Sequence, residues 1–411
     1  MQTRLAPGIE GTPAGEEGKA IVGNCVHCGF CLATCPTYQL LGDELDGPRG
    51  RIYLIRQVLE GETPTAKTQL HLDRCLTCRA CETTCPSGVQ YGRLLDIGRE
   101  LVDAQVPRSA PARLLRGALK EGLTSNAFAP ALRLGQALRP LLPAALKNKI
   151  PSEQPASAWP TRKHPRKMLL LAGCVQPAMT PNINPATARV FDSVGIEMIV
   201  PRSAGCCGAI RHHLSDQSGA LEQARHNIDA WWPHIEAGAE ALVMNASGCG
   251  AMIKEYAHLL RHDPAYAAKA GRVCAMTRDV AELLAEHAGA LREQQKNTTS
   301  QRVVFHPPCT LQHAQQIRGV VESILTTLGA DVLPFAEGHL CCGSAGTYSV
   351  LQPDLAKQLR DRKLAALMAP QPEIILSANV GCISHIAGAA QIPVQHWIEW
   401  LDARMSPGKP A

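Results

Sequence analysis

Apolar residues in the C-terminal half of the chain alternate between short runs and longer amphipathic stretches. The short runs are typical of buried strands, and the stretches between them have the spacing of helices. Six strands are predicted, at residues 168–172, 196–200, 241–244, 303–305, 331–335 and 373–376, and helices near 185–194, 216–232, 312–328 and 353–368. Because strands that alternate with helices form parallel sheets, this half is predicted to be α/β.

The N-terminal part shows helical periodicity instead. Residues 50–60 place apolar side chains on one face of a helix, with Pro48 before them and Gly61 after them, as helix boundaries commonly have. A basic amphipathic helix is predicted around 114–120. Another is predicted over 131–142, where nearby prolines limit its length.

Cysteines reveal an internal repeat in the C-terminal half. Each unit has a single cysteine, a Cys-Cys-Gly triplet and a closing cysteine, and corresponding positions lie 135, 135 and 133 residues apart. The first unit contains Cys174, Cys206, Cys207 and Cys249, and the second contains Cys309, Cys341, Cys342 and Cys382. A repeat of this length indicates a duplicated domain. Since each cysteine position follows a predicted strand, we expect four thiols per unit to converge beyond the carboxyl ends of the strands.

A second cysteine pattern occurs twice before residue 90. The spacing Cys-x2-Cys-x2-Cys-x3-Cys-Pro begins at Cys25 and again at Cys75. Bacterial ferredoxins use this spacing to bind four-iron, four-sulfur clusters, and the cysteine before proline ligates the other cluster. One predicted set is Cys25, Cys28, Cys31 and Cys85, and the other is Cys75, Cys78, Cys81 and Cys35. Zinc sites and disulfides fit poorly, because zinc ligands come as separated pairs and no secretory signal opens the chain.

Composition and charge limit the other functions of the chain. With 45% hydrophobic and 19% charged residues, it has the composition of a soluble globular protein, and no apolar run is long enough to span a membrane. Residues 101–170 hold twelve Lys or Arg against three acidic residues. This basic block suits an anionic membrane surface or an acidic partner, although its helices could instead cap the neighbouring domains. Nucleic acid is not expected as a partner, since aromatic residues for base stacking are scarce there.

These motifs together resemble a known family, the iron–sulfur subunits of bacterial glycolate oxidase (glycolate dehydrogenase), which combine a ferredoxin domain with tandem cysteine-rich (CCG) domains. The resemblance covers residues 20–402, and its most specific stretches are 25–55, 75–89, 227–242 and 339–348. It implies that partner flavoprotein subunits oxidise glycolate to glyoxylate, while this chain passes electrons through two 4Fe-4S clusters toward the quinone pool. The chain itself would not oxidise the substrate.

The motifs that the chain lacks agree with that division of labour. No G-x-G-x-x-G follows a strand and no phosphate-binding loop is present, so no flavin is expected in this chain. Related lactate or glycerol-3-phosphate dehydrogenase subunits, and a self-contained thiol–disulfide or quinone reductase acting at the CCG sites, are the alternatives. A further alternative is a non-catalytic scaffold whose repeats are stabilised by zinc.

The repeats depart from the family members that hold unusual non-cubane clusters, because each ends in one cysteine rather than a Cys-x2-Cys pair. An additional iron–sulfur cluster, zinc or another metal, and metal-free thiols therefore all remain open for the eight repeat cysteines. His306, three residues before Cys309, and His339, two residues before Cys341, could contact such a metal or pass a proton to a quinone, and His212-His213 follows the first triplet. Lone histidines are more often structural.

The expected architecture is α+β and multidomain: a helix-rich dicluster ferredoxin-like domain followed by two tandem α/β repeats. The expected divisions are a flexible N-terminus at 1–20, the ferredoxin-like domain at 21–100, a basic helical connector at 101–165, CCG repeats at 166–295 and 296–402, and a flexible C-terminus at 403–411. The expected location is cytoplasmic, peripheral on the cytoplasmic face of the inner membrane.

Overall fold

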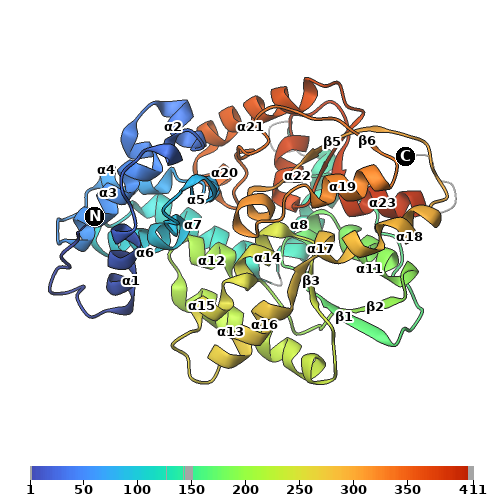
Figure 1. Ribbon diagram of the computed structural model, residues 1–411, viewed down its shortest axis with the longest axis horizontal. Coiled ribbons are helices and arrows are strands. Elements are labelled where there is room, and N and C mark those ends of the chain that lie inside the picture. The colour runs from blue at the N-terminus through green and yellow to red at the C-terminus, as the bar shows by residue number, and fades with distance from the viewer. Residues whose placement is uncertain (1, 126, 142, 144–150, 406–411) are drawn as a thin grey trace.

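The structure is a computed structural model that describes residues 2–125, 127–141, 143 and 151–405. Figure 1 shows a helical N-terminal domain at one end of the molecule and two sheet-containing repeats that form the rest. The fold class predicted from the sequence, α+β with a helix-rich first domain and two α/β repeats, is confirmed. In the described part of the chain no helix is both long enough and apolar enough to cross a membrane.

Six α-helices build the N-terminal domain. They are α1 (Pro13–Gly23), α2 (Pro36–Leu41), α3 (Pro48–Leu59), α4 (Ala66–Asp73), α5 (Ala80–Thr84) and α6 (Tyr91–Gln105). The helix predicted over 50–60 is α3, which begins at Pro48 as expected. It packs on α6 so closely that a Cβ at Gly98 would lie 2.5 Å from a side-chain carbon of Ile55. Ile55, Leu94 and Leu95 are fully buried at this contact.

The N-terminus differs from the expectation of a flexible segment over residues 1–20. Leu5 is buried, the Ala6 N–H donates to the carbonyl of Leu59 at 2.9 Å, and α1 begins at Pro13 behind the N-cap Thr12. The reason is that the apolar side chains of α1, including Val22, complete the core of the domain.

The C-terminus also differs in part. Helix α23 (Trp397–Met405) continues through residues 403–405, which were expected to be flexible. Arg404 is buried, and its guanidinium stacks 4.0 Å from the centre of the Trp400 ring. The rest of the expected flexible segment, 406–411, lies outside the described residues.

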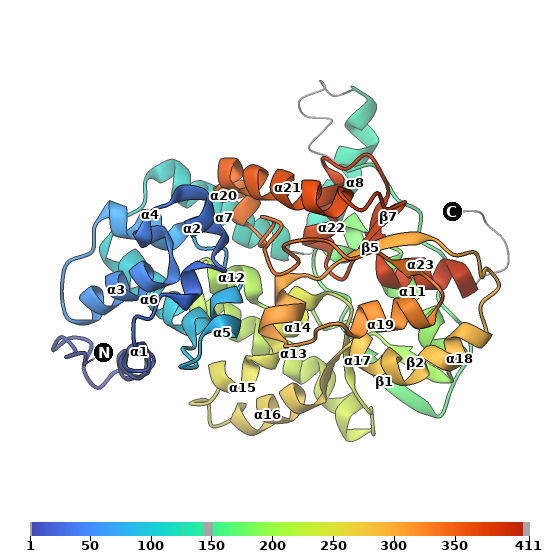
Figure 2. The ribbon, with the colours of Figure 1, turned by 45° about the horizontal axis from the view of Figure 1, so that its top comes forward.

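The described part of the connector includes the helices α7 (Ala110–Thr124) and α8 (Phe128–Leu138), followed by the 3-10 turn η3 (Arg139–Leu141). Helix α7 includes the predicted basic helix at 114–120. Helix α8 begins three residues before the predicted start at 131, and residue 142, the predicted end, lies outside the described residues. Figure 2 shows α8 at the upper margin of the molecule.

Each repeat contains a four-stranded parallel sheet. The first has the order β2-β1-β3-β4 and the second the order β6-β5-β7-β8. The strands are β1 (Arg166–Leu170), β2 (Ile196–Ile199), β3 (Leu242–Met244), β4 (Thr277–Asp279), β5 (Arg302–His306), β6 (Asp331–Val332), β7 (Ile374–Ser377) and β8 (Val394–His396). All six predicted strands are present. The edge strands β4 and β8 were missed, because three-residue strands with polar sequences carry no alternating signal.

Helices cover both sheets and join the repeats. In the first repeat these are α10 (Gln176–Met179), α11 (Ile183–Ser193), α12 (Ala209–His213), α13 (Gln217–Glu236), α14 (Ser247–Lys254), α15 (Tyr256–Leu259), α16 (Ala267–Met276), α17 (Val280–Leu284) and α18 (Ala288–Glu293). In the second they are the π-helix η5 (Thr310–Ala314), α19 (Val320–Thr327), α20 (Tyr348–Leu351), α21 (Pro353–Met368), α22 (Val380–Ala387) and α23. The helix predicted over 312–328 is thus divided into η5 and α19.

The two repeats share one hydrophobic core. Phe191 of α11 and Trp397 of α23 belong to the same buried cluster, although they come from different repeats. Arg189 of α11 also binds both carboxylate oxygens of Asp402 in α23, at 2.9 and 2.6 Å. Because this core is continuous, the repeats form one rigid support for the cysteines at the carboxyl ends of their strands.

Candidate metal centres

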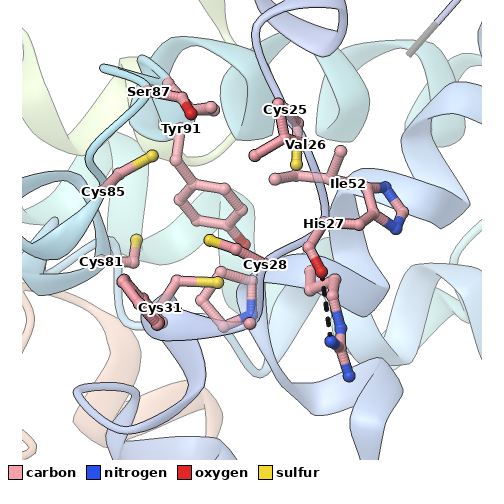
Figure 3. A pocket seen from close by; sticks show the side chains of 15 residues that line it. Cys25, Val26, His27, Cys28, Cys31, Ile52, Cys81, Cys85, Ser87 and Tyr91 are labelled. Atoms are coloured by element: carbon pink, nitrogen blue, oxygen red, sulfur yellow. Dashed lines mark hydrogen bonds between the residues drawn. The ribbon is translucent and has the colours of Figure 1, made fainter.

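One hollow of the N-terminal domain brings together the first predicted ligand set. Its lining includes Cys25, Cys28 and Cys31 from the loop before α2 and Cys85 from the end of α5 (Figure 3). The loop turns through left-handed backbone at His27 and Gly29, with φ of 55° and 84°. This curvature lets three closely spaced cysteines surround one point, as a cluster requires.

The second motif repeats this geometry. Thr77 and Arg79 have φ of 54° and 60°, at the same positions after Cys75 as His27 and Gly29 have after Cys25. The Thr77 N–H donates to the Cys75 sulfur at 3.4 Å. Burial raises the pKa of the Cys81 thiol well above its usual value, and the nearby thiols of Cys78, Cys75 and Cys35 raise it further. The four thiols of the second set therefore lie near one another.

A buried arginine lies beside the second set. Arg51 of α3 is fully buried and donates to the His71 carbonyl at 2.7 Å. It also faces Asp46, a fully buried carboxylate, at 3.5 Å. Burial by itself would lower the pKa of Arg51, but neighbouring groups, led by Cys75, raise it above its usual value. Arg51 was missed from the sequence, because nothing in a helix-like stretch shows that one arginine will point inward.

Polar groups also contact the sulfurs of the second set directly. The Thr37 hydroxyl lies 3.3 Å from the Cys35 sulfur, and the Tyr91 hydroxyl donates to the Cys75 sulfur at 3.7 Å. Arg99 donates to the Cys75 carbonyl at 2.8 Å. Hydrogen bonds to cluster sulfurs tune the reduction potential, so Thr37 and Tyr91 are further functional candidates that the sequence did not indicate, whereas Arg99 holds the Cys75 backbone.

In the first repeat, the four predicted cysteines converge as the strand topology implies. The Cys174 thiol donates to the Cys206 sulfur at 3.4 Å, and contacts continue from Cys206 to Cys207 and from Cys207 to Cys249. Hydrogen bonds from Cys174 and then Cys207 lower the pKa of Cys206 to about 3. The same bond raises the pKa of Cys174. The four thiols of the first repeat therefore form one continuous chain of contacts.

The glycine of each Cys-Cys-Gly triplet has a steric role. Gly208 and Gly343 have φ of 92° and 88°, in the left-handed region where side chains are strained. A Cβ at Gly343 would also lie 2.5 Å from the carbonyl oxygen of Ala356. At Gly208 the corresponding distance, to Ala220, is 3.1 Å. The triplet is therefore a tight turn that sets two adjacent thiols against the following helix.

In the second repeat, the thiols also come together, and they extend to the ferredoxin domain. Cys309 contacts Cys341, Cys341 contacts Cys342, and Cys342 contacts Cys382. The Cys309 thiol also contacts Cys78 of the second ferredoxin-type set. The second repeat thus lies directly against one predicted cluster site, an adjacency that the sequence could not show.

The candidate histidines separate into different environments. His306 lies among the thiols of the second repeat, with Cys342 and Cys382. His339 is in no such group among the described residues, and its carbonyl accepts a bond from His313 at 2.9 Å. His212 and His213 both face Asp96 of α6, at 3.0 and 3.4 Å.

The Asp96 ion pairs join the ferredoxin domain to the first repeat. Burial would raise the pKa of Asp96 and lower that of His212, but their mutual attraction lowers the first and raises the second. A histidine with a raised pKa contributes stability that is complete below its ordinary pKa and is lost as pH rises through the raised value. Asp96, whose pKa is lowered, contributes stability that is complete above its ordinary pKa of 3.8 and is lost as pH falls through the lowered value. The interface is therefore strongest in the weakly acidic range between them.

We expect Asp96→Asn to lower the free energy of unfolding by about 3 kcal/mol near pH 6 and by clearly less at pH 9. Urea unfolding across this pH range, followed by fluorescence under anaerobic conditions, measures the difference. His212→Gln is the matched control and should remove the same pH dependence. Parallel pH profiles for wild type and Asp96→Asn would show that the pair does not stabilise the interface.

Comparisons with known proteins agree with this organisation. Residues 21–89 match the family model of the 4Fe-4S dicluster domain, and residues 168–254 and 303–387 each match that of the cysteine-rich domain. The glycolate oxidase iron-sulfur subunit of Escherichia coli (strain K12) is 53% identical over 98% of this chain and 98% of its own length.

More distant relatives match as well. The probable glycolate oxidase iron-sulfur subunit of Bacillus subtilis (strain 168) is 31% identical, over 90% of this chain and 88% of its own. Lactate utilization protein A of Geobacillus kaustophilus is 26% identical and aligns over 99% of its length, but covers only 58% of this chain.

Proposed function

Because the chain belongs to the family of glycolate oxidase iron–sulfur subunits, we propose that it is the electron-transfer subunit of a flavin-dependent complex that oxidises glycolate to glyoxylate. The observation that carries the proposal is the pair of ferredoxin-type cysteine sets, within a chain that matches the E. coli subunit along 98% of its length. Two bound four-iron clusters would supply acceptance and release of single electrons. The lactate relatives cover too little of the chain to favour that substrate.

We assign the ligands as the sequence predicts. Cys25, Cys28, Cys31 and Cys85 hold one cluster, and Cys75, Cys78, Cys81 and Cys35 hold the other. The common hollow around the first set and the mutual pKa effects within the second support this crossed arrangement. Cys81 also lines the hollow of the first set, so the two cluster sites are adjacent.

The surroundings of the two sets give them different positions in an electron path. The first set lies at the surface: Cys28 is exposed, and the neighbouring Val26 and Phe30 are 69% and 60% exposed. We assign the flavoprotein contact to this apolar surface, because it brings a partner's flavin nearest to a cluster. The second set is buried against the second repeat through Cys78 and Cys309.

The function is tested with the chain purified alone and with its flavoprotein partners. The chain alone is expected to show no glycolate oxidation, since a two-electron oxidation needs a hydride acceptor such as flavin. The assembled complex should reduce quinone with glycolate. Glycolate oxidation by the chain alone, in the absence of flavin, would overturn the proposal.

The connector supports a peripheral contact with an anionic membrane surface. Some of its basic side chains form ion pairs within the protein: Arg108 and Arg116 bind Asp73, and Lys120 binds Asp216. The apolar face of the connector remains at the surface. Its exposed side chains are Leu114, Leu115, Leu134, Leu138 and Leu141, at 76%, 42%, 62%, 44% and 82%. Exposed Arg113 and Arg133 flank these leucines, as in helices that lie on anionic lipid.

We expect the double variant Leu114→Asp, Leu134→Asp to bind vesicles of mixed anionic and neutral phospholipid at least tenfold more weakly than wild type. Cosedimentation of the complex with the vesicles measures this. Val350→Asp, an exposed apolar position (48%) outside the connector, is the control and should bind as wild type does. Equal binding of all three proteins would exclude the connector as the contact.

A further inference from the structure

His306 is a buried histidine whose two ring nitrogens have no hydrogen-bonding partner among the residues that the structure describes. It ends β5 and is completely buried, and within the described part of the chain neither Nδ1 nor Nε2 has a protein partner. Leaving such polar atoms unsatisfied in the interior destabilises a protein. A group that satisfies His306 is therefore expected at this position.

The neighbours of His306 are cysteines, whose side chains commonly bind metal ions. One ligand atom each from His306, Cys342 and Cys382 lies within 4.8 Å of the other two, and all three residues are buried. Cys341, whose thiol contacts that of Cys342, lies outside this group of three and would have to move toward the ion to become a fourth ligand. Imidazole and thiolate together are donors that zinc prefers, commonly with four ligands in a tetrahedron.

The compactness of this group separates it from the cluster sites. A single ion brings all its ligand atoms within about 2.0–2.3 Å of one centre, so they lie close together, whereas a four-iron cluster holds its cysteine sulfurs apart by its own width. Among the described residues, neither ferredoxin-type set forms a group of three ligand atoms within 4.8 Å. The cysteines of the first repeat do not either. The geometry at His306 therefore fits one ion.

The two repeats differ at the position of His306, the histidine among the candidate ligands. Three residues before Cys309 the second repeat has His306, whereas three residues before Cys174 the first has Leu171, a buried apolar side chain. The second repeat also buries a cation near its thiols: Lys363 is 1% exposed and donates to the Glu337 carbonyl at 2.5 Å. A buried positive charge suits a centre with several thiolates.

We propose that the second repeat, and not the first, binds one zinc-type divalent ion through His306, Cys342 and Cys382, with Cys341 as the fourth ligand. Two thiolates would neutralise the divalent ion. The negative charge of a third thiolate would be balanced by Lys363. The site is a closed, structural centre between the shared core and the second ferredoxin-type set. This zinc site does not depend on the proposed electron-transfer function. The iron and sulfide content of the same sample reports separately on the two clusters.

The test is metal analysis of the intact complex, purified anaerobically from cells supplied with both iron and zinc. Wild type should contain about one zinc in addition to about eight irons per chain. His306→Gln and Cys382→Ser should each lower zinc at least tenfold while the iron content is retained. Cys249→Ser, at the corresponding position of the first repeat, should keep the zinc.

Zinc-edge X-ray absorption on wild type keeps the proposal testable should the variants fail to fold. The expected first shell has sulfur at about 2.3 Å and nitrogen at about 2.0 Å. Wild type without zinc, zinc retained in both His306→Gln and Cys382→Ser, or a first shell without sulfur would each overturn the proposal. So would about twelve irons per chain that fall to about eight in Cys382→Ser, because that result would put a cluster in the second repeat instead.

Discussion

Cys85→Ser is expected to lower the iron content of the chain from about eight to about four atoms and to abolish glycolate-dependent quinone reduction by the complex. The reason is that serine oxygen is a much harder ligand than thiolate and holds iron–sulfur clusters poorly. Cys85 lines the same hollow as Cys25, Cys28 and Cys31, so the cluster lost should be the one at the surface. The second cluster should remain.

The crossed ligand assignment is tested by comparing variants in pairs. Cys85→Ser should leave the same electron paramagnetic resonance spectrum as Cys28→Ser, because both would remove the surface cluster. Cys35→Ser should instead match Cys78→Ser. Cys274→Ser is the control: Cys274 lies in α16, belongs to neither set, and its thiol donates to the Ile253 carbonyl. A Cys85→Ser spectrum that matched Cys78→Ser would show that each motif supplies its own four ligands.

Arg51→Gln is expected to lower the reduction potential of the cluster in the second set by roughly 80 mV. A unit charge about 8 Å away, at an effective dielectric constant of about 20, contributes roughly 2 kcal/mol, which corresponds to this shift for one electron. The charge near Cys75 and Cys35 favours the reduced, more negative cluster. Because Arg51 also faces the buried Asp46, the free energy of unfolding should fall by about 3 kcal/mol.

Arg49→Gln is the matched control for Arg51. Arg49 lies on the same helix, but its side chain is 33% exposed and pairs with Glu44 at the surface. Its removal should change stability by less than about 1 kcal/mol and should change the potential of the second-set cluster by little, because Arg49 lies instead beside the hollow of the first set. An anaerobic redox titration of both variants, followed by urea unfolding, provides the measurements. Equal potentials for wild type and Arg51→Gln would mean that Arg51 does not influence the cluster.

The sequence was sufficient to predict the features that depend on local spacing. The short apolar runs and the helical spacing located six strands and the helix α3, and the separation of 135 residues between Cys-Cys-Gly triplets identified the duplicated domain. The convergence of Cys174 with Cys206 follows from parallel topology, because both positions come after strands of one sheet. These inferences need no knowledge of long-range contacts.

Features that depend on packing between distant segments were not predictable. No local pattern shows that α1 would complete a core with α3, that Cys78 would meet Cys309, or that Arg51 would be buried. Each arises from a contact between segments far apart in sequence, and a single sequence carries no sign of such contacts. His306 was noticed only for its position near Cys309. Its lack of partners became evident from the fold.

The most direct test of the central claim is electron paramagnetic resonance of the anaerobic complex, frozen at intervals after mixing with glycolate. Signals of reduced four-iron clusters should appear during turnover and decay when quinone is added, and the chain without its flavoprotein partners should give no signal with glycolate. Clusters that stay oxidised while the complex reduces quinone at its full rate would contradict the claim, because electrons would then bypass this chain.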